Sequence, residues 1–211
     1  MIVAHDRTGV VDYDAGNLKS VETALRYLGA DFFVSGNPSD FSSADRLIFP
    51  GVGEAGAAMA VLSRTGLDKM ITDFHHSGKP LLGICLGCQI VLSHSEEGNT
   101  VCLGLVDGEV KRFPPATGLK VPHMGWNQVT WPSSARHPLF NGIPESSSFY
   151  FVHSYYPSPA DTAIVAGETL YGIRFASVFV KDNLCATQFH PEKSGRKGLR
   201  LLDNFLSWKV K

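Results

Sequence analysis

The stretch Lys79-Pro-Leu-Leu-Gly-Ile-Cys-Leu-Gly-Cys-Gln-Ile-Val-Leu92 decides how this chain folds. Pro80 to Ile84 is a short apolar run typical of a buried strand, and Leu86 to Ser93 carries apolar residues at helical spacing. Cys85 stands between the two, with a glycine two residues away on either side. Such glycines let the backbone turn sharply and push the central side chain outward. The pattern predicts a strand, a tight turn that carries Cys85, and a helix.

This position suits a nucleophile. The start of a helix favours the reactive thiolate through unpaired N–H groups and the positive end of the dipole. Two other interpretations stay open at this point. Cys85 can be a buried structural cysteine in a strand-to-helix turn, or one half of a Cys85-x-x-Cys88 redox pair or zinc site. Cys102 and Cys185 stand alone, so no second Cys-x-x-Cys completes a metal site, and we expect no metal.

Length and composition narrow the class of protein. The 211 residues with 44% apolar content suit a globular domain with a sizeable core. The 19 basic and 20 acidic residues nearly cancel, which gives no electrostatic basis for a nucleic-acid or membrane partner. No apolar run approaches the ~20 residues of a membrane helix. Four cysteines make no disulfide framework and no charged-then-apolar leader opens the chain, so we expect a cytoplasmic location.

The first half of the chain alternates between strand and helix patterns. We predict strands at 8–13, 32–34, 46–49 and 80–84, and helices at 18–28, 57–62, 67–76 and 86–93. This alternation with short connections is typical of a parallel sheet covered by helices on both faces. Residues 1–7 show no clear pattern, and we expect an irregular extension there.

The second half is rich in β-strand patterns. We predict strands at 106–113, 127–131, 148–153, 162–166, 173–180 and 183–189, then a last helix from Gly195 with Ser194 as its cap. No linker, repeat or low-complexity tract divides the chain, so we expect one domain over residues 1–211. The fold class is α/β, with a mixed, mostly parallel central sheet.

A glycine-rich loop, Pro50-Gly-Val-Gly53, follows the strand at 46–49. Ligands of parallel sheets bind at the carboxyl ends of the strands, where this loop and Cys85 both lie. The N–H groups of Gly51, Val52 and Gly53 are therefore candidates for cradling an anion. The alternative is a plain strand-to-helix turn.

A thiolate that attacks an amide needs a base, usually a histidine oriented by a third group. In Gln188-Phe-His-Pro-Glu192, His190 and Glu192 are two residues apart and project to the same side of an extended chain. A carboxylate beside the imidazole sets its tautomer and favours its charged form. A solvated surface turn is the competing interpretation. We keep His123 and His153 as substrate or partner contacts, although a structural role is the simpler expectation for both.

The segments Gly-Ile-Cys-Leu-Gly-Cys-Gln, Pro-Gly-Val-Gly and Gln-Phe-His-Pro-Glu-Lys-Ser, in this order, resemble the class I glutamine amidotransferases over roughly Thr8 to Trp208. The resemblance implies a single amidotransferase domain without a cofactor. It also implies a set of site residues: the triad Cys85, His190 and Glu192; oxyanion donors at Gly51, Val52, Gly53 and Leu86; and glutamine contacts at Gln89, Glu97, Ser154 and Tyr155.

Three further segments, Asp12 to Asn17, Val121 to Asn127 and Phe149 to Tyr155, resemble amidotransferase subunits of histidine biosynthesis. This implies hydrolysis of glutamine through a cysteine thioester and delivery of ammonia to a (β/α)₈-barrel cyclase subunit. We expect Trp126, Asn127 and Tyr150 at or near that interface. Cys88 departs from the methionine that the family often has there. The alternatives are an amidotransferase serving another synthase, a cysteine hydrolase of similar architecture, and a non-enzymatic redox module.

Overall fold

In the computed structural model, which describes residues 6–14, 18–115, 118–131 and 137–210, a seven-stranded sheet forms the centre of the chain. The strand order is β11-β12-β13-β4-β3-β1-β2. The strands from β13 to β2 run parallel, whereas β12 and β11 join antiparallel at one edge. The strands of this sheet are β1 (Thr8–Val11), β2 (Phe32–Ser35), β3 (Arg46–Gly51), β4 (Leu81–Cys85), β11 (Val165–Tyr171), β12 (Ile173–Lys181) and β13 (Leu184–Thr187).

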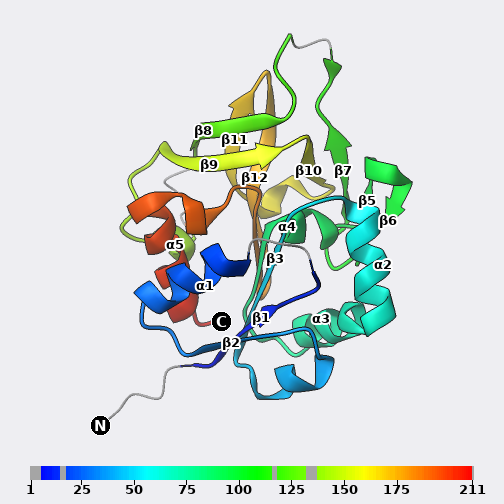
Figure 1. Ribbon diagram of the computed structural model, residues 1–211. Coiled ribbons are helices and arrows are strands. Elements are labelled where there is room, and N and C mark those ends of the chain that lie inside the picture. Colours follow the sequence, from blue (N-terminus) through cyan, green and yellow to red (C-terminus); the bar gives the residue numbers. More distant parts are fainter. Residues whose placement is uncertain (1–5, 15–17, 116–117, 132–136, 211) are drawn as a thin grey trace.

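Helices cover both faces of this sheet (Figure 1). α1 (Leu18–Tyr27) and α5 (Gly195–Ser207) share one buried apolar cluster, and α2 (Ala55–Thr65), α3 (Leu67–His76) and the short α4 (Leu86–Ile90) share another. Along β4, Leu81 belongs to the second cluster whereas Leu82 and Ile84 belong to the first, as the period of two in a strand requires. The predicted α/β architecture is confirmed. None of the described helices is both long and apolar enough to cross a membrane.

The second half adds two smaller sheets above the carboxyl ends of the parallel strands (Figure 1). One has the order β10-β7-β5-β6, and the other is the hairpin β8/β9. Ser154 is the single residue between β9 and β10, so the chain changes sheet there. The bounds are β5 (His94–Ser95), β6 (Thr100–Val101), β7 (Gly108–Arg112), β8 (His123–Val129), β9 (Ser147–His153) and β10 (Tyr155–Pro159).

Three predicted elements differ from the structure because tertiary pairing overrides the local pattern. The helix expected to reach Ser93 ends at Ile90, since His94 and Ser95 pair with β7. The segment 162–166 begins as a 3-10 turn and becomes a strand only at Val165. The strand expected from Asn127 already begins at His123, which pairs with His153.

Asp6, near the N-terminus, is connected by hydrogen bonds to the segment that follows α5. Residues 1–5 of the expected extension lie outside the described residues. Asp6 accepts hydrogen bonds from Arg46 and from Lys209, the latter at 2.6 Å. The buried Arg46 also donates to the carbonyl oxygens of Phe205 and Trp208, at 2.9 and 3.0 Å. Asp6 and Arg7 have no regular secondary structure, and the side chain of Asp6 forms a polar anchor with Arg46 and Lys209.

Candidate active site

Cys85 sits in a strained turn at the junction of β4 and α4. Its backbone angles are φ 54° and ψ −105°. Residues other than glycine rarely adopt this conformation, and such strained residues cluster at functional sites. A Cβ atom at Gly83 would lie 2.9 Å from the carbonyl oxygen of Gly87, and one at Gly87 would lie 1.9 Å from that of Phe49. Neither position has room for a side chain, so the predicted reason for both glycines is confirmed.

The environment of the thiol differs from the expectation in one respect. α4 is only five residues long, so its dipole contributes less than the sequence pattern indicated. The donor that faces the sulfur is instead a side chain, because Gln188 Nε2 lies 3.8 Å from Cys85 Sγ. All four cysteines are free and buried, and burial raises the pKa of the Cys88 thiol. Cys88 thus has the character of a core residue.

The expected base lies directly beyond β13, the parallel neighbour of β4. His190 Nδ1 is 2.8 Å from Glu192 Oε1, and both side chains are buried. Glu192 belongs to a 3-10 turn, Pro191–Lys193, rather than to the extended chain that we predicted, and the turn still brings the carboxylate back to the ring. His190 Nε2 has no hydrogen-bond partner among the described residues, which leaves it for chemistry at Cys85.

The electrostatics suit a thiolate–imidazolium pair. Burial lowers the pKa of His190, but a Cys85 thiolate and the Glu192 carboxylate outweigh burial and raise that pKa to about 10. His190 therefore holds its proton near neutral pH whenever the thiolate is present. A protonated histidine beside a thiolate is the starting state for nucleophilic attack with proton return to the leaving group.

Cys85 opens into a cavity of about 310 Å³. Its walls contain eight residues that the sequence predicted, namely Val52, Gly53, Cys85, Leu86, Gln89, Glu97, Ser154 and Tyr155. Pro122, Val152 and His153 complete the lining. Gly51 does not line the cavity: it is buried at the end of β3, in register with Cys85. A larger hollow of about 660 Å³ beside β11 and β12 contains none of the triad.

Two segments that follow neighbouring parallel strands contribute backbone to the cavity wall, Val52 and Gly53 after β3 and Leu86 after β4. α4 begins at Leu86, whose N–H is one of those that a helix leaves unpaired. Gly53 has φ +104°, a conformation that favours glycine and lets the loop run past Cys85. Val52, Gly53 and Leu86 line the same cavity at the ends of two adjacent parallel strands. Three of the four residues that we expected to stabilise an oxyanion therefore meet there, and Gly51 does not.

Two polar side chains shape the other end of the cavity. Glu97 Oε2 accepts a hydrogen bond from the N–H of Ala55 at 2.8 Å, and burial raises the pKa of Glu97 despite this bond. Gln89 uses both hydrogens of Nε2, with the Tyr155 carbonyl oxygen at 2.9 Å and Gln188 Oε1 at 2.8 Å. Only the carbonyl oxygen of Gln89 is left for a ligand, so both side chains present acceptors.

Gln188 is the site residue that the sequence interpretation missed. It lies two residues before His190, and the period of two in an extended chain puts both on the same side. That spacing was a usable signal. Pro122 and Val152 had no local signal, because the pairing of β8 with β9 brings their segments together.

The comparisons with known proteins agree with this geometry. The model of the family "Glutamine amidotransferase class-I" matches residues 9–208. This chain belongs to the class I glutamine amidotransferases. It is 50% identical to imidazole glycerol phosphate synthase subunit HisH of Dehalococcoides mccartyi over 93% of this chain and 94% of the relative. The same subunit of Neisseria meningitidis is 47% identical, over 96% of this chain and 100% of the relative.

Solved structures share the fold at lower identity. The structure of PurLQS from Thermotoga maritima superposes with a TM-score of 0.76 at 19% identity, covering 96% of this chain and 98% of that chain. A crystal structure of a glutamine amidotransferase gives 0.70 at 19% identity, covering 95% and 97%. Proteins with little sequence in common with this chain thus share its fold.

Proposed function

We propose that this chain is the glutaminase subunit of imidazole glycerol phosphate synthase, which supplies ammonia for histidine biosynthesis. The main support is the joint occurrence of a buried Cys85–His190–Glu192 set and about 50% identity, over nearly the whole chain, to curated subunits of that synthase. A single domain over residues 1–211 is part of the proposal, since the family match spans 9–208.

The chemistry follows from the three side chains. The Cys85 thiolate attacks the side-chain amide carbon of glutamine, and His190 gives its proton to the nitrogen as the C–N bond breaks. Ammonia leaves and a glutamyl thioester remains on Cys85. His190 then takes a proton from water, whose oxygen attacks the thioester and releases glutamate. Glu192 keeps the imidazole oriented through its hydrogen bond to Nδ1.

The oxyanion that forms in both steps needs N–H donors in the cavity wall. We assign this role to the N–H of Leu86 and to the loop of Gly51, Val52 and Gly53. Removal of one such donor typically lowers turnover by about 10²–10³-fold. A turn of one peptide in this loop is therefore enough to switch the site on or off.

Glutamine itself fits the polar end of the cavity. Its α-ammonium group has three donors, and the acceptors at hand are the Glu97 carboxylate and the free carbonyl oxygen of Gln89. We place its main-chain carboxylate against the backbone of Ser154 and Tyr155. A neutral amide at the opposite end then reaches Cys85.

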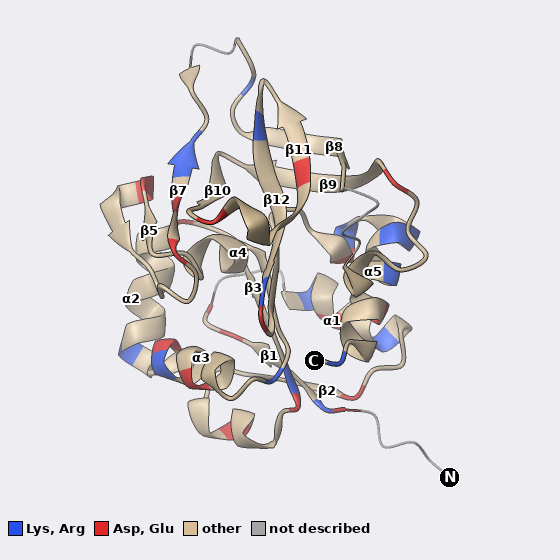
Figure 2. Ribbon diagram, turned by 180° about the vertical axis from the view of Figure 1, so that it is seen from behind, with Lys and Arg blue, Asp and Glu red and all other residues tan. Residues whose placement is uncertain are grey.

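Free ammonia is protonated in water and is then no nucleophile, so the subunit works only when docked on a synthase. The proposed partner is a (β/α)₈-barrel cyclase, which uses the ammonia to make imidazole glycerol phosphate and AICAR. The hairpin β8/β9 is the candidate docking face. Met124 and Trp126 are 63% and 59% exposed on β8, and neither β8 nor β9 contains a Lys, Arg, Asp or Glu residue (Figure 2).

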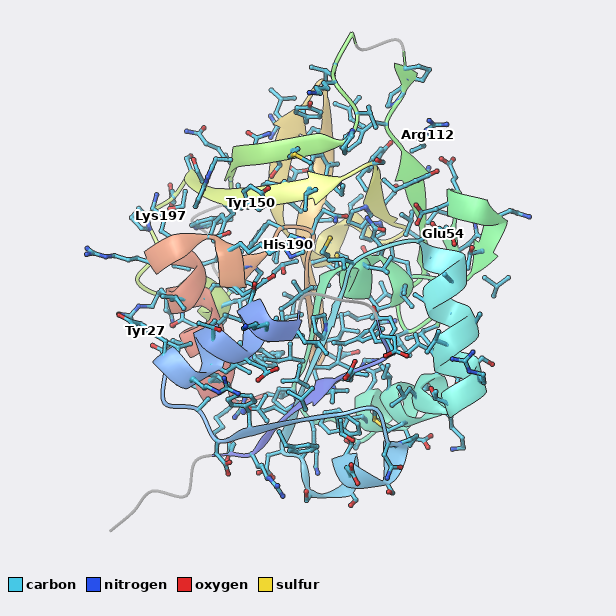
Figure 3. The ribbon with its side chains drawn as sticks, in the orientation of Figure 1. Tyr27, Glu54, Arg112, Tyr150, His190 and Lys197 are labelled. Carbon is cyan, nitrogen blue, oxygen red and sulfur yellow. The ribbon has the colours of Figure 1, made fainter. Side chains whose placement is uncertain are left out.

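This face lies next to the triad. Trp126 contacts the ring of Tyr150, with centroids 6.2 Å apart, and the Tyr150 carbonyl oxygen accepts the N–H of His190 at 2.9 Å (Figure 3). Asn127 behaves differently from its neighbours, because its side chain bonds inward to His123 and to the Leu170 carbonyl oxygen. Trp126 and Tyr150 therefore remain the interface candidates.

The test is glutamate release from glutamine by the chain alone, with the cyclase, and with the cyclase plus its ribulosyl ligand. We expect release mainly in the last mixture and none with Cys85→Ala or His190→Ala. Cys88→Ala, the same change at the buried neighbour, should retain release. Equal release by the chain alone would argue for an amidotransferase with another acceptor, and cleavage of a generic peptide would argue for a cysteine hydrolase.

A further inference from the structure

Two hydrogen-bond chains meet at one backbone atom, the carbonyl oxygen of Tyr155. It lies 2.9 Å from Gln89 Nε2 and 2.7 Å from His153 Nδ1. A carbonyl oxygen only accepts hydrogen bonds, so both nitrogens must carry a hydrogen. This one acceptor therefore determines the direction of every bond in both chains.

The first chain runs to the nucleophile. Gln89 presents its nitrogen to Gln188 Oε1 at 2.8 Å, so the other end of the Gln188 amide is its NH₂ group. That group faces Cys85 Sγ at 3.8 Å. The Tyr155 carbonyl oxygen therefore fixes the orientation of the Gln89 amide, and Gln89 fixes that of Gln188. As a result, Gln188 presents an N–H donor to the sulfur, and such a donor favours the thiolate.

The second chain runs to the surface hairpin. His153 carries its hydrogen on Nδ1, so a neutral ring accepts at Nε2, and the atom facing it, His123 Nδ1 at 2.9 Å, must donate. His123 Nε2 then accepts from Asn127 Nδ2 at 3.2 Å. Asn127 is oriented independently, because Nδ2 also faces the Leu170 carbonyl oxygen and Oδ1 accepts the N–H of Gln128. The Tyr155 carbonyl oxygen at one end of this chain and the Asn127 amide at the other therefore require the same tautomer, Nδ1–H, at both rings.

The surroundings keep the histidine pair neutral. The ring of His123 stacks between Phe151 and Tyr171, with centroids at 4.8 and 4.0 Å. Burial lowers the pKa of His123 to about 4 and that of His153 to about 3. A positive charge on either neighbouring histidine, His123 or His190, would lower the pKa of His153 further. A proton added to the pair would set two N–H groups against each other.

We propose that His153 and His123 are positioning residues of the glutamine site. As a neutral pair with fixed tautomers, they hold the Tyr155 carbonyl oxygen where it orients Gln89 and, through Gln188, the donor to Cys85. On the side of the β8/β9 hairpin, the Asn127 amide donates to His123 and so keeps the tautomer of the pair. This inference rests on the proposed function, since the site that it concerns is the one assigned to glutamine.

The first test needs no variant. Nitrogen-15 spectra of histidine-labelled protein, in complex with the cyclase, report which ring nitrogen carries the proton. We expect the Nδ1–H form for both His123 and His153 between pH 5.5 and 8, with the exposed His76 as an internal reference. An Nε2–H form or an imidazolium at either ring in this range overturns the proposal.

The second test separates the N–H donor from the ring. His123→Phe keeps the stacking between Phe151 and Tyr171 but leaves His153 Nε2 without a donor, whereas His123→Gln supplies an amide N–H. We expect His123→Phe to lower kcat/KM for glutamine by about 10- to 100-fold, mainly through kcat, with an acid limb shifted to higher pH. We expect His123→Gln to stay within about threefold of the wild type.

Equal activity of the wild type and both variants, or an equal loss in both, overturns the proposal. Glutamate release by the wild-type complex distinguishes a failure of the proposed function from a failure of the positioning role. If the wild-type complex releases no glutamate, the proposed function is wrong. If it does and His123→Phe matches His123→Gln, only the positioning role is wrong.

Discussion

Gln188 Nε2 faces Cys85 Sγ at 3.8 Å, while Gln188 Oε1 accepts a hydrogen bond from Gln89 Nε2 at 2.8 Å. One side-chain amide thus joins the nucleophile to a residue of the cavity wall. Because the amide cannot reverse without placing two NH₂ groups together, the sulfur always meets a donor. Gln188 therefore gives the thiolate a hydrogen-bond donor in addition to the proton on His190.

Changing this donor to an acceptor should weaken the nucleophile. Gln188→Glu keeps the bond from Gln89 but sets a carboxylate oxygen against the sulfur, which disfavours the thiolate. We expect kcat for glutamine to fall by about 10²-fold and the alkylation of Cys85 by iodoacetamide to require higher pH. Gln188→Met, which removes the donor without adding charge, should show a smaller loss. Alkylation with an unchanged pH profile in Gln188→Glu would show that the contact has no effect on the thiol.

The Tyr13 hydroxyl predicts an unusual stabilising substitution. It is buried below Gly51, without a hydrogen-bond partner among the described residues, and burial raises the pKa of Tyr13. Because an unsatisfied buried hydroxyl costs free energy, Tyr13→Phe should raise the free energy of unfolding by about 1 kcal/mol in urea titrations.

The same chemical change at Tyr171 is the control. Its hydroxyl donates to the Lys120 carbonyl oxygen at 2.6 Å, so Tyr171→Phe should lower stability by about 0.5–1.5 kcal/mol. A loss of similar size in Tyr13→Phe would mean that the Tyr13 hydroxyl has a partner in solution.

The sequence was sufficient for features that are local. The Cys85 turn and the His190–Glu192 pair each lie within a few residues, so the sequence pointed to both, although the pair meets through a 3-10 turn and not through extended chain. The His123–His153 pair could not be predicted, because the rings are 30 residues apart and meet only through the register of β8 with β9. Neither the length of α4 nor the Asp6 anchor is encoded nearby, since β7 ends the helix and Arg46 binds Asp6.

The buried histidines His123 and His153 should make the protein less stable in mild acid. Their pKa values are about 4 and 3 in the folded state, below the value of about 6.5 for an unfolded histidine. Below about pH 6.5 the unfolded chain therefore binds more protons at these two positions than the folded chain does. The part of the free energy of unfolding that depends on His123 and His153 is complete above about pH 6.5 and declines as the pH falls toward 4. Each histidine contributes up to about 1.4 kcal/mol per pH unit.

Urea unfolding between pH 7.5 and 5 measures this slope. His123→Phe should reduce the slope below about pH 6.5 because it removes one of the histidines whose pKa burial lowers, while His75 and His137 still contribute to the slope. Identical slopes in the wild type and His123→Phe would contradict the assignment of a neutral buried pair.

The exposed ring of Trp126 should carry binding energy for the cyclase. Aromatic residues that become fully covered in an interface are typical hot spots, and truncation to alanine costs about 2 kcal/mol or more. We expect Trp126→Ala to weaken the affinity for the cyclase by at least about 30-fold, measured by calorimetry, and wild-type tryptophan fluorescence to become protected from quenching on binding. Tyr27→Ala, at a ring 78% exposed on α1 and away from the hairpin, is the matched control and should leave affinity unchanged. If both variants bind like the wild type and quenching of Trp126 is the same with and without cyclase, the docking face lies elsewhere than on β8 and β9.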